Sequence, residues 1–170
     1  MKKYGTVKRK EFSDEGKTVG RNSLVLIVPK DKSKISIEQL PTVNRIAIGT
    51  VETVPAGKYA QQTLTKLNLW NQVESKIVYG KDVKAVGAYV AEGSADAGFV
   101  YKTDAMDLQN RVEVAAVAPS DSHDAIRYPI AIVTKYDNEL AQQFYDYLTS
   151  NEAQQILQKY GFTSVANSAK

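Results

Sequence analysis

Short apolar runs that alternate with helix-like segments are the feature that most restricts the fold of this 170-residue chain. These runs occupy residues 23–29, 45–49, 75–80, 96–101, 112–118 and 128–134. A short apolar run without alternating polar residues is typical of a strand that is buried on both faces. We therefore expect an α/β fold, with a mostly parallel sheet flanked by helices.

Two segments between these runs place apolar residues at helical spacing. They contain Ala56, Tyr59, Ala60, Leu64 and Leu67, and then Val83, Val86, Gly87 and Val90. Strands that alternate with helices of this length are joined by right-handed crossovers, so both faces of the sheet should be covered.

The last 35 residues differ, because their pattern predicts two consecutive helices and no further strand. One apolar face has Leu140, Phe144, Tyr147 and Leu148, and the next has Ala153, Ile156, Leu157 and Tyr160. Thr149 and Glu152 have the spacing of a capping box, and Gly161 suits a C-terminal cap.

Composition excludes several classes of site. The chain has no cysteine and a single histidine, His123, which excludes disulfide scaffolds, zinc–thiolate sites and multi-histidine metal sites. No apolar run approaches the roughly 20 residues of a membrane span. The first residues, MKKYGTVKRKEF, are basic but have no apolar segment behind them, so we expect no signal peptide in this chain.

The net charge of +3 is unevenly distributed, because residues 1–34 hold ten Lys/Arg and four Asp/Glu. A basic segment of this kind can contact nucleic acid, but here it lacks interleaved aromatic residues and a recognition motif. We expect a solvated leader and no nucleic-acid partner.

Three predicted strand ends carry groups that could bind an anion. Pro55 suits the first turn of a helix and would leave the N–H groups of Ala56 and Gly57 free. Asp82 suits an N-cap, which places the Val83 N–H at a helix start. Tyr101 ends the apolar run at 96–101, directly after DAGFV. Ligands of open α/β sheets bind at such strand ends, so these groups predict an anion site built from neutral donors.

The sequence supports an enzyme less well than it supports an anion site. Residues 119–124, PSDSHD, gather serine, histidine and aspartate, but neighbours in a polar loop rarely have the geometry of a catalytic triad, so a surface loop is expected. GSADAG precedes a strand, whereas a phosphate loop would follow one. We expect no catalytic residue and no cofactor.

Four motifs together resemble the molybdate-binding proteins of bacterial ABC uptake transporters, over about residues 22–162. They are VPAGKYA, GKDVKAVGAYVAEGSADAGFVYKTDA, YPIAIV and FYDYLTSNEAQQILQKYGF. The resemblance implies a class II periplasmic-binding-protein fold that closes on molybdate or tungstate and delivers it to an ABC permease. It assigns the oxyanion to Ala56, Val83 and Tyr101, with Gly57 and Asp82 beside them, and implies no metal-cation site.

The same resemblance implies the domain organisation. Residues 22–134 would form one complete lobe, 1–21 a basic leader left from the first lobe, and 135–170 a helical return segment of that largely missing lobe. The chain therefore looks truncated at its N-terminus, and two serine-bearing loops of the family would be absent. Thr50 and Val51 also replace the Asp-Pro of many relatives. The complete protein would be extracytoplasmic, and the uncovered 135–170 helices would favour self-association.

Alternatives remain at this point. An anion-sensing regulatory domain could use the same fold, a truncated remnant could have lost binding, and a small-molecule hydrolase is the least favoured because no nucleophile–base pair is evident. Lys58, Lys81 and Lys102 lie near the predicted donors in sequence, but we expect them to stay solvated and not to neutralise the ligand.

Overall fold

The computed structural model describes residues 11–13 and 16–165. Their contacts divide the chain into two compact units: Ser23–Ala125, here the central unit, and the segments up to Asn22 and from Ile126, here the terminal unit. The expected lobe ended at residue 134, and the structure places the division earlier because the strand after Ile126 pairs with the N-terminal segment.

The central unit contains a five-stranded sheet in the order β4-β3-β5-β2-β6. Its strands are β2 (Leu24–Pro29), β3 (Ile46–Gly49), β4 (Ile77–Gly80), β5 (Ala97–Tyr101) and β6 (Val112–Val117). β3 is parallel to β4 and β5, whereas β2 is antiparallel to β5 and β6. The sheet is therefore mixed: β3, β4, β5 and β6 share one direction, in agreement with the expected mostly parallel sheet, and β2 runs opposite to them. An apolar run shows that a strand is buried but does not reveal its direction.

Helices cover the sheet of the central unit. They are the 3₁₀ segments η1 (Ile37–Thr42) and η2 (Glu74–Lys76) and the α-helices α1 (Pro55–Lys66), α2 (Trp70–Val73), α3 (Val83–Ala91) and α4 (Lys102–Asp107). The chain moves from β3 outward to β4 and then back across β3 to β5, so right-handed crossovers place α1 and α3 on opposite faces. Val86 and Val90 of α3 pack in the core against Val25, Ala47 and Val100 of the sheet.

Close backbone contact fixes the start of α1 on the end of β3. A Cβ added at Gly57 would collide with the carbonyl group of Gly49, and one added at Gly49 would collide with Val54. Gly80, at the end of β4, lies equally close to α3: a Cβ added at Gly80 would be only 2.8 Å from Val86 Cγ2. Glycine at these positions lets each helix begin directly against a strand end.

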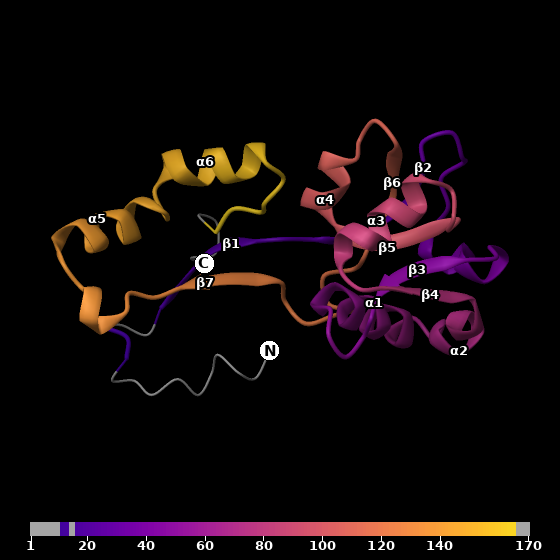
Figure 1. Ribbon diagram of the computed structural model, residues 1–170, viewed down its shortest axis with the longest axis horizontal. Coiled ribbons are helices and arrows are strands. Elements are labelled where there is room, and N and C mark those ends of the chain that lie inside the picture. Colours follow the sequence, from indigo (N-terminus) through magenta and orange to yellow (C-terminus); the bar gives the residue numbers. More distant parts are fainter. Residues whose placement is uncertain (1–10, 14–15, 166–170) are drawn as a thin grey trace. The chain divides into compact units, whose positions relative to one another are not determined.

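The terminal unit is a two-stranded antiparallel ribbon with helices packed beside it (Figure 1). Its elements are β1 (Lys17–Arg21), β7 (Arg127–Ile130), η3 (Thr134–Tyr136), α5 (Glu139–Tyr147) and α6 (Asn151–Lys159). The two predicted helices are thus confirmed. Gly161 has the left-handed φ of 93° expected of a C-terminal cap. The N-cap of α6, however, is Ser150 and not Thr149, since the Ser150 hydroxyl accepts the Ala153 N–H.

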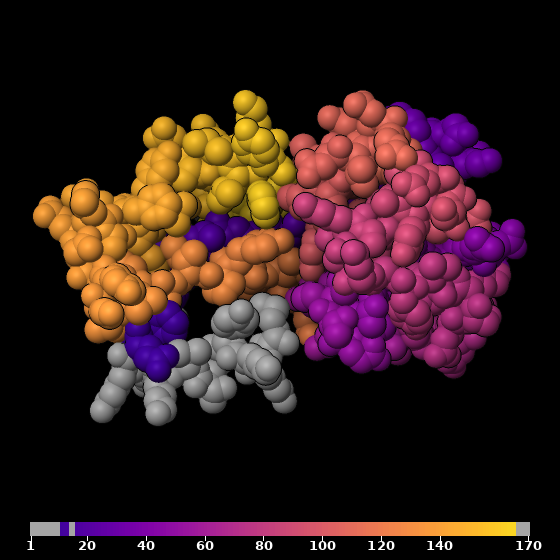
Figure 2. Space-filling model, in the orientation of Figure 1, coloured from indigo at the N-terminus to yellow at the C-terminus, as the bar shows by residue number. Residues whose placement is uncertain are grey.

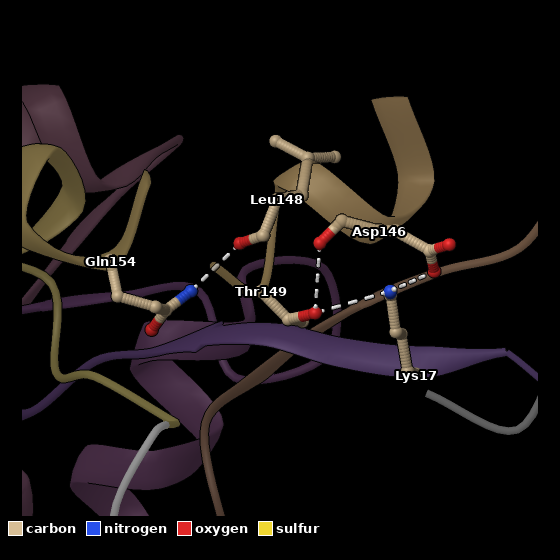
Figure 3. Close-up of polar contacts among 5 residues, drawn as sticks. All are labelled: Lys17, Asp146, Leu148, Thr149 and Gln154. Carbon is tan, nitrogen blue, oxygen red and sulfur yellow. Dashed lines mark hydrogen bonds and ion pairs between the residues drawn. The ribbon is translucent and has the colours of Figure 1, made fainter. Parts of the chain in front are cut away.

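A buried amide joins the parts of the terminal unit (Figure 3). The Gln154 side chain is only 2% exposed. Its Nε2 donates to the carbonyls of Val19 (2.8 Å) and Leu148 (2.9 Å), and its Oε1 accepts from the Ser164 hydroxyl and the Val165 N–H. All four hydrogen-bonding positions of the amide are used, so Gln154 links β1, the α5–α6 corner and the segment after α6.

Lys17 of β1 adds a second link to the same corner (Figure 3). Its Nζ lies 3.3 Å from Asp146 Oδ1 and donates to the Thr149 hydroxyl at 3.2 Å.

In the described part of the chain, no helix combines the length and the apolar character that a membrane-spanning segment requires.

The Gly57 contact generates a stability prediction. Gly57→Ala should lower the free energy of unfolding of the central unit by about 1–3 kcal/mol, because the added methyl overpacks the β3 end. The change can be measured by urea denaturation with fluorescence of Trp70, the single tryptophan of the chain, which lies in α2 of the same unit. Thr65→Ala, at an exposed position of α1, is the matched control and should change stability by less than about 0.5 kcal/mol. Equal stability of the two variants would contradict the close contact.

Candidate functional site

The carboxyl ends of β4, β3 and β5 meet at one edge of the central sheet. The register pairs Gly49 with Gly80 and Ala47 with Gly98, so the three strands end almost level. Just beyond, the Thr50 N–H and hydroxyl both donate to the Gly80 carbonyl, at 3.0 and 3.2 Å. The segments that leave β3, β4 and β5 therefore start side by side.

Ala56 lies in the first turn of α1, after β3. Its side chain is 1% exposed, and Pro55 before it occupies the start of the helix as predicted. In the described residues, no group accepts a hydrogen bond from the Ala56 N–H. The Gly57 N–H, in contrast, donates to the Val54 carbonyl at 3.0 Å. The prediction that both N–H groups are free is thus wrong for Gly57, whose part is to let α1 approach the strand end.

Val83 is the first residue of α3, after β4. Asp82 is its N-cap, as predicted: Oδ1 accepts the Ala85 N–H at 2.8 Å. This side chain therefore satisfies an inner donor of the helix, and the Val83 N–H has no acceptor in the described part of the chain. Asp82 caps the helix, and the Val83 N–H at its start is unpaired within the described residues.

Tyr101 is the last residue of β5 and the N-cap of α4. It is half-buried, and its N–H donates to Asp104 Oδ2 at 3.3 Å. The next residue is fixed as well, because the Lys102 N–H donates to the Ser23 carbonyl at 2.9 Å. These bonds hold the backbone at the end of β5, from which the phenol extends.

The three predicted donors thus belong to adjacent strand ends of one sheet. β3 and β5 are neighbours, but the chain leaves β3 toward β4 and leaves β5 toward β6. Connections that diverge in this way open a crevice beyond the carboxyl ends of the strands, where ligands of open α/β sheets bind. Two helix starts and a phenol at this edge can donate hydrogen bonds to an anion.

The three lysines that are near the predicted donors in sequence lie in solvent or beside other groups. Lys58 is half-exposed and lies 3.8 Å from Asp124, and Lys81 is exposed. Lys102 lines a separate cavity of about 280 Å³ together with Lys30, Lys34 and Glu113. These positions agree with the expectation that the lysines stay solvated.

The Asp104 carboxyl accepts the hydrogen bond from the Tyr101 backbone and is partly buried there. Burial raises the pKa of Asp104, and the hydrogen bond from the Tyr101 N–H opposes this shift. Burial favours the neutral form of this carboxyl more in the folded chain than in an unfolded one.

Sequence reasoning missed the glycines at the strand ends. Gly49 and Gly80 close the runs RIAIG and SKIVYG, and both face the first turn of the helix that follows. The recurrence of glycine as the last residue of an apolar run was the available signal, since it marks close approach of a helix to a strand.

The loop 119–124 is anchored and is not a catalytic triad. The Ser122 hydroxyl is buried and hydrogen-bonded to Thr63 Oγ1 at 2.8 Å, and Asp124 exchanges two hydrogen bonds with Gln62. His123 packs against the Tyr59 ring, and its Nδ1 contacts the Asp124 carbonyl. The loop is therefore attached to the side of α1, a detail absent from the expectation of a simple surface loop.

Known proteins resemble the chain along most of its length. "Putative ABC transporter substrate-binding lipoprotein YvgL" of Bacillus subtilis is 48% identical over 89% of this chain and 58% of its own length. "Molybdate-binding protein ModA" of Haemophilus influenzae is 37% identical over 95% of this chain and 66% of its own. The chain thus spans less than two thirds of the length of these two relatives.

A solved structure shows the same fold. The "substrate binding domain of putative molybdenum ABC transporter from Clostridium difficile" superposes with a TM-score of 0.85 at 38% identity, covering 92% of this chain and 69% of that one. Residues 2–163 match the family described as bacterial extracellular solute-binding protein. The chain therefore belongs to the bacterial extracellular solute-binding proteins.

Proposed function

We propose that this chain binds a tetrahedral oxyanion, molybdate or tungstate, as part of a solute-binding protein that delivers it to an ABC transporter. The observation that carries the proposal is the alignment of Ala56, Val83 and Tyr101 at three adjacent strand ends, with the N–H groups of Ala56 and Val83 lacking acceptors in the described residues. The name of the Haemophilus influenzae relative supports the choice of molybdate.

The proposed donors are neutral, so the ligand charge would be stabilised by helix starts and by hydrogen bonds. Neutral donors do not distinguish molybdate from sulfate by charge, because both are dianions. Selectivity would therefore depend on the radius that the donors enclose. Tungstate has nearly the size of molybdate and would bind in the same way.

The proposed role is transport without catalysis, as the family description implies. We place the complete protein outside the cytoplasmic membrane, because the family is described as extracellular and the Bacillus subtilis relative is named a lipoprotein. The partners would be the oxyanion and the transporter permease, with no cofactor.

The tyrosine provides the first test of this function. Tyr101→Phe should weaken molybdate binding about tenfold or more, because a hydrogen bond to a charged group contributes roughly 1.5–3 kcal/mol. Calorimetric titration of this chain with molybdate, with sulfate and phosphate alongside, measures the effect. Tyr79→Phe, on the exposed Tyr79 of β4, is the matched control and should leave the affinity unchanged.

Single alanine variants of Lys58, Lys81 and Lys102 sharpen the same test. Each should lower the affinity far less than Tyr101→Phe does. Unchanged affinity in Tyr101→Phe would remove the tyrosine from the site. A lysine variant with an equal loss would show that a cation, and not neutral donors, balances the ligand charge.

We also propose that the helices of the terminal unit mediate self-association. Their surface carries large exposed apolar residues: Tyr136, Leu140, Phe144, Ile156 and Tyr160. Leu140 and Phe144 are four residues apart on α5, and Ile156 and Tyr160 are four apart on α6, so each pair shares a helix face. α5 and α6 lie at the surface of their unit, orange to yellow in Figure 2. A second copy offers the same apolar patch and can form a two-fold contact.

Sedimentation velocity over a range of concentrations tests this contact. The chain should dimerise with rising concentration, and the double variant Leu140→Asp/Phe144→Asp should remain monomeric. Val117→Asp, at an equally exposed apolar position of β6 in the central unit, is the control and should dimerise like the unmodified chain. A strictly monomeric unmodified chain would reject self-association, and dimerisation of the double variant would reject this patch as its interface.

A further inference from the structure

A row of polar side chains crosses the ribbon of the terminal unit. Arg21 of β1 is the direct partner of Arg127 on β7, and on its other side it forms a bridge with Thr163. The bridge is tight, because the Arg21 N–H donates to the Thr163 carbonyl at 3.0 Å and its carbonyl accepts the Thr163 N–H at 2.8 Å. Directly opposed residues of antiparallel strands project to the same face, so the two guanidinium groups and the Thr163 hydroxyl share one side of the ribbon.

This side of the ribbon faces away from α6. Gly20 precedes Arg21 and therefore points to the opposite face. A Cβ at Gly20 would lie 3.9 Å from Leu157 Cδ1 of α6, which identifies the helix-covered face. Phe162, the neighbour of Thr163, is on that face as well, since its ring packs edge-on against Tyr128. The arginine row occupies the face that α6 leaves uncovered.

The row is electrostatically unfavourable as it stands. Like charges directly opposite each other on paired strands destabilise the pairing. In addition, Arg21 Nε is buried, and within residues 11–13 and 16–165 it has no hydrogen-bond partner. A buried donor without an acceptor lowers stability, and more so when it is charged. The ion pairs of the described residues include neither arginine.

We propose that Arg21 and Arg127, with Thr163 beside them, form a second anion site, which binds a pair of anionic oxygens from a carboxylate or a tetrahedral oxyanion. One such group removes both unfavourable features at once. Its charge screens the two guanidinium groups from each other. Its oxygens accept the Arg21 Nε–H after the side chain has turned to admit them, because this atom is buried in the structure. The planar guanidinium matches a two-oxygen group through parallel N–H donors, which a lysine cannot provide.

This site is separate from the one assigned to molybdate. Ala56, Val83 and Tyr101 belong to the central unit, whereas the arginine row belongs to the terminal unit. The donors also differ in kind, because the row is cationic and the other set is neutral. Cationic donors favour any accessible carboxylate or oxyanion, so the arginine site should be broad in specificity and weaker.

NMR of arginine side chains tests the proposal directly. The Nε–H signal of Arg21 is followed while malonate, a dicarboxylate, or phosphate is added at constant ionic strength set with chloride. The signal should move to a plateau with at least one of them. Arg127→Gln should raise the apparent dissociation constant about tenfold or more, because one charged partner of the anion is lost. Arg127→Lys should recover only part of the affinity, since it restores charge without the planar fork.

The control is Lys159→Gln, at an exposed position of α6, which should leave the titration unchanged. Backbone amide spectra of each variant show whether the ribbon is intact. A plateau with malonate alone identifies a side-chain carboxylate as the natural group, and a plateau with phosphate identifies a free oxyanion. A signal that moves linearly with both anions, or that saturates equally in Arg127→Gln, would overturn the proposal and indicate an adventitious ion only.

Discussion

The contact between the first turn of α1 and the last residue of β3 is the constraint on which the candidate site depends. Gly57 packs against the Gly49 backbone with no room for a side chain, so the first turn of α1 lies directly against the end of β3. Its first N–H groups are thereby directed to the edge where β4 and β5 also end. Gly80 places α3 in the same way. The positions of Ala56 and Val83 follow from backbone packing and not from polar interactions of their own.

This origin explains why the proposed site needs no cation. A helix start fixed by packing presents N–H donors that are already oriented, and such donors lose little entropy when an anion binds. The terminal unit shows the opposite arrangement, since Arg21 and Arg127 place two positive charges together without a counterion in the described residues.

The sequence predicts the helix starts and ends well, because local residue preferences determine them. Pro55 and Asp82 begin their helices as expected, and Gly161 ends one, because these residue types have strong positional preferences. The direction of β2 and the pairing of β7 with β1 could not be predicted, because an apolar pattern carries no information about which strand lies beside it. The hydrogen bond that occupies the Gly57 N–H was missed for a similar reason, as it depends on the tight turn at Val54.

The central claim is that the N–H groups of Ala56 and Val83 donate directly to the bound oxyanion. Amide NMR of the chain during a molybdate titration measures this most directly. The account predicts that the Ala56 and Val83 amide signals move together, by amounts larger than those of the remaining helix residues, and reach a plateau at the same dissociation constant. Amide signals of Ala56 and Val83 that stay in place while molybdate binds elsewhere on the chain would contradict it.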